Sequence, residues 1–98
     1  MKTAFLDTWT ESERGWGQRG DGCTIHLTRE DYNAFVKAYW DRMPDEVQDE
    51  YTRPDNCLRE AVLSDEIYKK LEESENGIRF WQSEFNEKKK ENEILFKD

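Results

Sequence analysis

The spacing of apolar side chains between residues 28 and 44 constrains the fold more than any other feature of the sequence. Steps of three, one, three, one and three residues separate Tyr32, Phe35, Val36, Tyr39, Trp40 and Met43. This spacing places all six on one face of an α-helix. Thr28 is a suitable N-cap, Asp31 stands where a capping-box acid belongs, and Pro44 stops the helix. We therefore predict a helix from Arg29 to Met43 whose aromatic face lies in the core.

The sequence before this helix is typical of β-strands. Residues 3–10 are rich in β-forming side chains, and residues 23–27 alternate apolar side chains with Thr24 and His26. Four glycines between these segments supply turn positions that tolerate positive φ. We therefore predict a β-hairpin over residues 3–27.

The sequence after the helix alternates between polar and apolar segments. We predict a surface loop over residues 44–56, in which residues 45–51 could form a short helical turn, because apolar residues are scarce there and two prolines interrupt it. Residues 58–63 read as a strand. Ser64 is a suitable N-cap for a second helix from Asp65 to Glu75, which the following Asn-Gly pair stops.

The last quarter of the chain contains two short apolar segments. Residues 78–82 and 94–96 are both rich in strand formers. Residues 86–92 between them are either the tip of a hairpin or a solvated helical turn, since their charges nearly cancel.

Length and composition indicate one folded domain over residues 1–98. A charged fraction of 39% would by itself favour disorder, but 13 aromatic residues can bury enough apolar area for a core. Together with the predicted elements, this indicates an α+β fold. We expect a small, mainly antiparallel sheet packed against one long amphipathic helix, plus a second short helix.

Negative charge is concentrated in one quarter of the chain. Between Asp41 and Glu66 there are nine acidic and three basic residues, which accounts for minus six of the net charge of minus eight. Such a surface repels nucleic acid and anionic membranes, and it accelerates the encounter with a basic protein. We therefore expect no direct nucleic-acid binding, because that would require clustered Lys and Arg.

The residue pattern gives little support to catalysis, a metal or a cofactor. His26 is the only histidine, and in a strand its side chain points away from that of Cys23. Asp45, Glu46, Asp49 and Glu50 lack the alternating ligands and central glycine of a calcium loop. We expect no enzyme, no catalytic or metal-binding residues and no cofactor, with a small metal-dependent enzyme as the lowest-ranked alternative.

The start of the chain and its cysteines indicate a cytoplasmic location. Residues 1–6 lack the apolar run of a signal peptide, and no segment approaches the roughly 20 apolar residues of a membrane span. Cys23 and Cys57 lack metal or redox spacing, so we expect two reduced, buried thiols.

Protein recognition is the function that the charge pattern favours. Acidic residues give long-range attraction, and neighbouring aromatic residues give the anchors that dominate interface energetics. The candidate partner-binding residues are Asp41, Asp45, Glu46, Asp49, Glu50, Tyr51, Asp55 and Trp16.

In size and charge the chain resembles the small acidic inhibitors encoded by phages and mobile elements, including anti-CRISPR proteins, some of which imitate the charge of DNA. The resemblance implies an inhibitor of a basic, nucleic-acid-handling protein such as a nuclease, and it assigns no residue a role. An antitoxin or immunity protein that neutralises a toxic nuclease is the neighbouring alternative.

Overall fold

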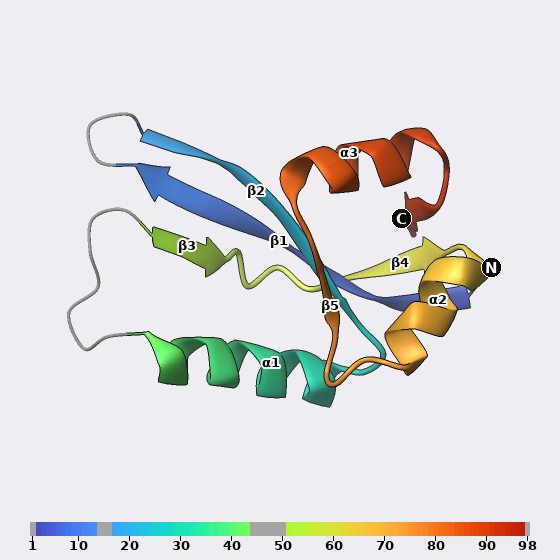
Figure 1. The fold of residues 1–98 in the computed structure, drawn as a ribbon, viewed down its shortest axis with the longest axis horizontal. Coiled ribbons are helices and arrows are strands. Elements are labelled where there is room, and N and C mark those ends of the chain that lie inside the picture. Colours follow the sequence, from blue (N-terminus) through green and yellow to red (C-terminus); the bar gives the residue numbers. More distant parts are fainter. Residues whose placement is uncertain (1, 14–16, 44–50, 98) are drawn as a thin grey trace.

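The computed structural model describes residues 2–13, 17–43 and 51–97. Within them, six strands and three helices form an α+β fold in which helices lie on both faces of one sheet (Figure 1). In chain order the elements are β1 (Lys2–Glu13), β2 (Gly17–His26), α1 (Arg29–Arg42), β3 (Tyr51–Pro54), β4 (Arg59–Leu63), α2 (Asp65–Glu72), β5 (Ile78–Phe80), α3 (Gln82–Lys90) and β6 (Ile94–Phe96).

The sheet is antiparallel and is organised around β1. One edge of β1 pairs with β2 along most of its length, from Phe5 opposite His26 to Glu13 opposite Gly17. Its other edge pairs first with β4 and then with β3. The strand order is β5-β2-β1-β4-β6, with β3 beside the distal half of β1. The predicted hairpin and the predicted antiparallel sheet are both confirmed.

The strand β3 corrects the loop predicted for residues 44–56. Its residue Arg53 lies opposite Thr10 of β1, and the amide of Asp55 donates a hydrogen bond to the Thr8 carbonyl at 2.9 Å. Four residues that include a proline carry no alternating pattern, so only the pairing with β1 specifies this strand. The helical turn considered for residues 45–51 falls almost entirely outside the described residues.

The face of the sheet under α2 and α3 holds an aliphatic core. Side chains from alternate positions of β1, β2 and β4 meet apolar residues of the two helices, as the period of two along a strand requires. Its buried members are Ala4, Leu6, Cys23, Ile25, Ala61, Leu63, Ile67, Leu71, Phe80, Phe85 and Ile94.

The opposite face of the sheet is covered by α1, whose predicted N-cap is confirmed. The Thr28 hydroxyl accepts a hydrogen bond from the Asp31 amide at 3.0 Å. The prediction that the whole aromatic face is core was wrong, because only Tyr32 is buried and Trp40 is 39% exposed. The ring of Tyr39 packs against the sheet, and one residue further on the helix has rotated by about 100°, which turns Trp40 toward its flank.

The other two helices differ in extent from the predictions. Ser64 caps α2 as expected, but the helix ends at Glu72 rather than Glu75. Of the two alternatives for residues 86–92, the helical one is correct as far as Lys90, where α3 ends. The fold therefore contains a third helix that the sequence analysis did not define.

A buried polar layer lies between α1 and the sheet. His26 Nδ1 lies 2.7 Å from the Asn76 carbonyl and Nε2 lies 2.8 Å from the Thr24 hydroxyl, which also accepts the Trp9 indole N–H at 2.9 Å. A carbonyl only accepts, so Nδ1 carries the proton. Burial lowers the pKa of His26, which leaves the ring neutral, so Nε2 accepts a hydrogen bond from the Thr24 hydroxyl. His26 is therefore a neutral, fully buried structural group.

This arrangement predicts a pH-dependent stability. Burial lowers the pKa of His26 below its ordinary value of 6.5, so folding is disfavoured once the unfolded chain takes up that proton. The free energy of unfolding should fall by about 1 kcal/mol between about pH 7.5 and about pH 5.5. Urea denaturation across this range measures the effect. His26→Gln should flatten the dependence, and an unchanged slope in that variant would assign the effect to other groups.

Candidate protein-binding surface

Residues 44–50, which hold four of the nine acids and which we call the acidic segment, are flanked in the sequence by elements that meet at one end of the molecule. The C-terminal end of α1, the start of β3 and the distal ends of β1 and β2 lie together there (Figure 1). Asp41 and Tyr51 are described, although the side chain of Tyr51 is not. Asp45, Glu46, Asp49, Glu50 and Trp16 lie outside the described residues.

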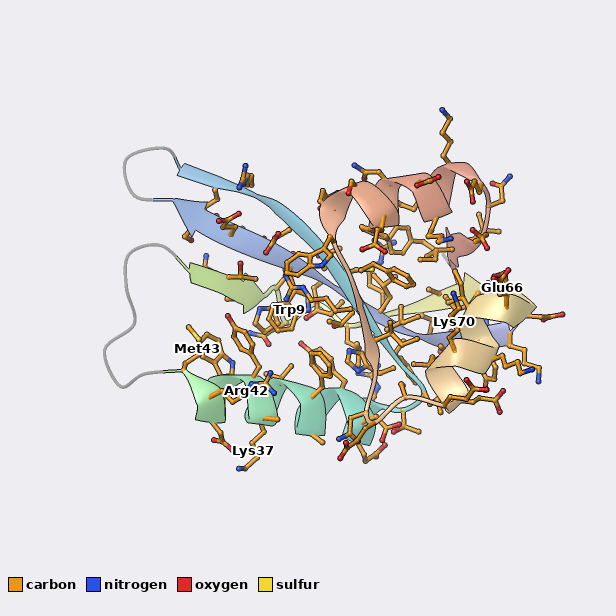
Figure 2. All side chains as sticks on the ribbon, viewed as in Figure 1. Trp9, Lys37, Arg42, Met43, Glu66 and Lys70 are labelled. Atoms are coloured by element: carbon orange, nitrogen blue, oxygen red, sulfur yellow. The ribbon has the colours of Figure 1, made fainter. Side chains whose placement is uncertain are left out.

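Asp41 lies on the exposed side of the last turns of α1. Its carboxylate accepts a hydrogen bond from Lys37 Nζ at 2.7 Å, and both side chains are mostly exposed. Lys37 points away from the sheet (Figure 2). Exposed pairs four residues apart on a helix contribute only about 0.3 to 0.5 kcal/mol, so a positive partner could replace Lys37 at low cost. Asp41 is thus compatible with a binding role.

Asp55 has a structural role of its own. Its carboxylate accepts hydrogen bonds from the hydroxyls of Thr8 at 2.5 Å and Thr10 at 2.6 Å, and its amide bonds to β1 as described above. These contacts fasten the end of β3 to the central strand. Asp55, which was predicted to bind the partner, therefore stabilises the pairing of β3 with β1.

A polar chain of contacts crosses the sheet next to this end. The Arg79 guanidinium donates to the Asp21 carboxylate at 2.9 Å, and the Thr52 hydroxyl donates to the same oxygen at 2.7 Å. The Tyr39 hydroxyl donates to the carbonyl of Thr52. These contacts therefore tie β5, β2, β3 and α1 together next to this end of the molecule.

An exposed tryptophan lies at each end of this chain of contacts. Trp81, which is 57% exposed, lies with its ring 4.5 Å from the Arg79 guanidinium carbon. At the other end, the Trp40 ring lies 5.2 Å from that of Tyr39. The buried Trp9 ring, which lies between the sheet and α1 (Figure 2), also contacts Arg79, and the centre of this ring lies 5.0 Å from the guanidinium carbon. The two exposed rings are candidate anchors, and we call Trp40, Asp41 and Trp81 the recognition surface.

Trp81 is the candidate that the sequence analysis missed. Residues 78–82 were interpreted as one strand, which hid the change from β5 to α3 at this position. The available signal was a bulky aromatic residue directly before the polar run that begins at Gln82. Arg79 was not identified because its partner Asp21 is 58 residues away in the sequence.

Replacing Trp81 should separate binding from folding. Trp81→Ala removes an exposed ring and its contact with Arg79, so the free energy of unfolding should change by less than about 1 kcal/mol. Trp9→Ala, which removes a buried ring, should cost about 3 to 5 kcal/mol. Chemical denaturation of both variants provides the comparison. A loss above about 3 kcal/mol for Trp81→Ala would show that its ring is a structural clamp instead.

The residues considered for catalysis, Cys23 and His26, are not arranged as a nucleophile and a base. Burial raises the pKa of the Cys23 thiol to about 12, so it is not a ready nucleophile. Cys23 belongs to the core on one face of the sheet and His26 to the polar layer on the other, as the strand period predicted. Cys57 is exposed, so the expectation of two buried thiols was wrong for it. Within residues 2–13, 17–43 and 51–97, no three His, Cys, Asp or Glu side chains cluster as metal ligands.

No family model matches the chain, and no curated protein or solved structure is significantly similar to it. The chain's own residues are therefore the guide to its function. None of the helices in the described part of the chain is long and apolar enough to cross a membrane.

Proposed function

We propose that this protein is an acidic inhibitor that binds a basic, nucleic-acid-handling protein inside a host cell and occupies the surface where phosphates would bind. The observation that carries the proposal is the position of the acidic segment. Residues 44–50 contain four acids and no base, and in the sequence they stand between α1, which carries Trp40 and Asp41, and β3. The four acids thus follow Trp40 and Asp41 within ten residues of sequence.

The physical roles of the two components are different. Four acids close in sequence attract a positive surface over a distance of about a Debye length, roughly 8 to 10 Å at physiological salt, which raises the encounter rate. Trp40 and Trp81 supply apolar area for short-range contact, where tryptophan is the residue most enriched among binding hot spots. Imitation of nucleic-acid charge requires the acidic residues, and a stable complex requires the exposed tryptophans.

Affinity capture with a matched control tests the proposal. In the test variant, Asp45, Glu46, Asp49 and Glu50 are changed to their amides. In the control, Glu72, Glu73, Glu75 and Glu87 are changed in the same way, so both proteins have a net charge of about minus four. All four control residues are exposed and lie on α2, just after it, or on α3.

We expect the wild type and the control to capture the same basic protein from a host lysate, and the test variant to lose it. The captured protein's activity on nucleic acid should fall in proportion to the amount of wild type added. A captured toxin encoded beside this gene would identify an immunity protein. Equal capture by the test and control variants would reject a specific role for the acidic segment.

A further inference from the structure

A polar cavity opens between the start of α1 and the turn that follows β3. Its volume is about 370 Å³, which is within the range of small-molecule sites. It is separate from the recognition surface, which involves the other end of α1. The lining residues are Arg29, Tyr32, Asn33, Asn56, Cys57 and Leu58.

The walls of the cavity are fixed by a buried carboxylate behind them. Asp7, which is fully buried, accepts hydrogen bonds from the Tyr32 hydroxyl at 2.6 Å and from the amides of Asn56 and Cys57 at 3.1 Å each. The three hydrogen bonds satisfy the carboxylate oxygens and tie α1 to the turn. The cavity therefore has a rigid frame, as preorganised binding sites do.

Two exposed polar side chains of the lining, Arg29 and Asn33, form no ion pair or hydrogen bond with another side chain in the described part of the chain. In the described part of the chain, no carboxylate pairs with Arg29, whose guanidinium carbon lies 5.2 Å from the centre of the Phe5 ring. The side-chain amide of Asn33 likewise makes no hydrogen bond there. A guanidinium with a neighbouring amide matches the acceptor pattern of a carboxylate or phosphate group.

We propose that this cavity binds a small organic anion. A carboxylate or phosphate group of the ligand accepts hydrogen bonds from Arg29 and Asn33, and the apolar part of the ligand contacts Leu58. The thiol of Cys57, which lines the same cavity, reports on occupancy because a bound anion shields it. This site is independent of the proposed inhibition.

Alkylation of Cys57 in the folded protein tests the site. Iodoacetate carries a carboxylate and iodoacetamide does not. With both reagents the Cys57 thiolate attacks the methylene carbon and releases iodide to solvent, so the ratio of their rates isolates the effect of the carboxylate. Cys23 is fully buried and serves as an internal reference that should not react. We expect the iodoacetate to iodoacetamide ratio at Cys57 to be at least about fivefold higher in the folded protein than in the urea-unfolded chain.

Two variants with the same change of charge show whether Arg29 causes the raised alkylation ratio at Cys57. Arg29→Gln should return the ratio to that of the unfolded chain, whereas Lys37→Gln, on the same helix, should leave it raised. Asn33→Ala should lower the ratio in part, and it provides a second variant if Arg29→Gln fails to fold.

Competition at constant ionic strength distinguishes the two ligand chemistries. Protection of Cys57 from iodoacetamide by malonate identifies a carboxylate site, and protection by inorganic phosphate identifies a phosphate site. A ratio that is equal in folded and unfolded protein, or one that survives Arg29→Gln, would overturn the proposal. Absence of protection by both anions would also overturn it.

Discussion

Replacing Asp7 by alanine should cost about 3 to 5 kcal/mol of unfolding free energy, because it leaves three buried donors unsatisfied at about 1 to 3 kcal/mol each. The carboxylate is fully buried and accepts three hydrogen bonds that join β1 to α1 and to the turn after β3. Its loss leaves the Tyr32 hydroxyl and two backbone amides without their acceptor in the interior, and each unsatisfied group is costly. Urea denaturation measures the change.

Asp55→Ala is the matched control for this prediction. Asp55 also accepts two side-chain hydrogen bonds, but the residue is exposed, so water can replace the carboxylate as the acceptor. We expect a loss of about 1 kcal/mol. We attribute the large contribution of Asp7 to its burial rather than to its number of hydrogen bonds. Equal losses of unfolding free energy in the two variants would contradict this.

Capping residues and alternating patterns in the sequence correctly predicted the starts of two helices and the first β-hairpin. The N-caps Thr28 and Ser64 both accept the hydrogen bonds expected of them, and the glycine-rich hairpin forms as predicted. Capping and alternation involve neighbours within a few residues, so the sequence displays them directly. Their success explains why the α+β class and the antiparallel sheet could be predicted.

Non-local contacts explain the errors. Trp40 was predicted to be buried because helical spacing shows which residues share a face but not how much of that face the sheet covers. The strand β3 depends on pairing with β1, about 40 residues earlier, and the partners of Asp7 come from α1 and the turn after β3. No local pattern encodes such pairings, so the polar layer and the cavity beside it were not predictable from this one sequence.

The candidate surface was predictable in its charge but not in its anchors. Counting residues was enough to locate the excess of acid between Asp41 and Glu66, and the structure then showed that four of these nine acids stand between α1 and β3 in the sequence. The exposure of Trp81 depends on where β5 ends and α3 begins, and its contact with Arg79 depends on the pairing of β5 with β2. Charge is a property of composition, whereas exposure is a property of the tertiary fold.

Neutralising the acidic segment should slow association with the basic partner about tenfold, with little change in the dissociation rate. The four carboxylates of residues 44–50 repel one another in the free protein, and a positive partner relieves that repulsion. The control variant with the same net charge, changed on and around α2 and α3, should associate nearly as fast as the wild type. Stability should be equal to or slightly above that of the wild type in the test variant.

The most direct test of a charge-steered inhibitor is the association rate constant measured against ionic strength for the wild type and both variants with the purified partner. We expect a steep decline with salt for the wild type and the control, and a shallow one for the test variant, with the three rates converging at about 1 M salt, where the screening length is only about 3 Å. Equal rates and a flat salt dependence for all three proteins would contradict steering by the acidic segment.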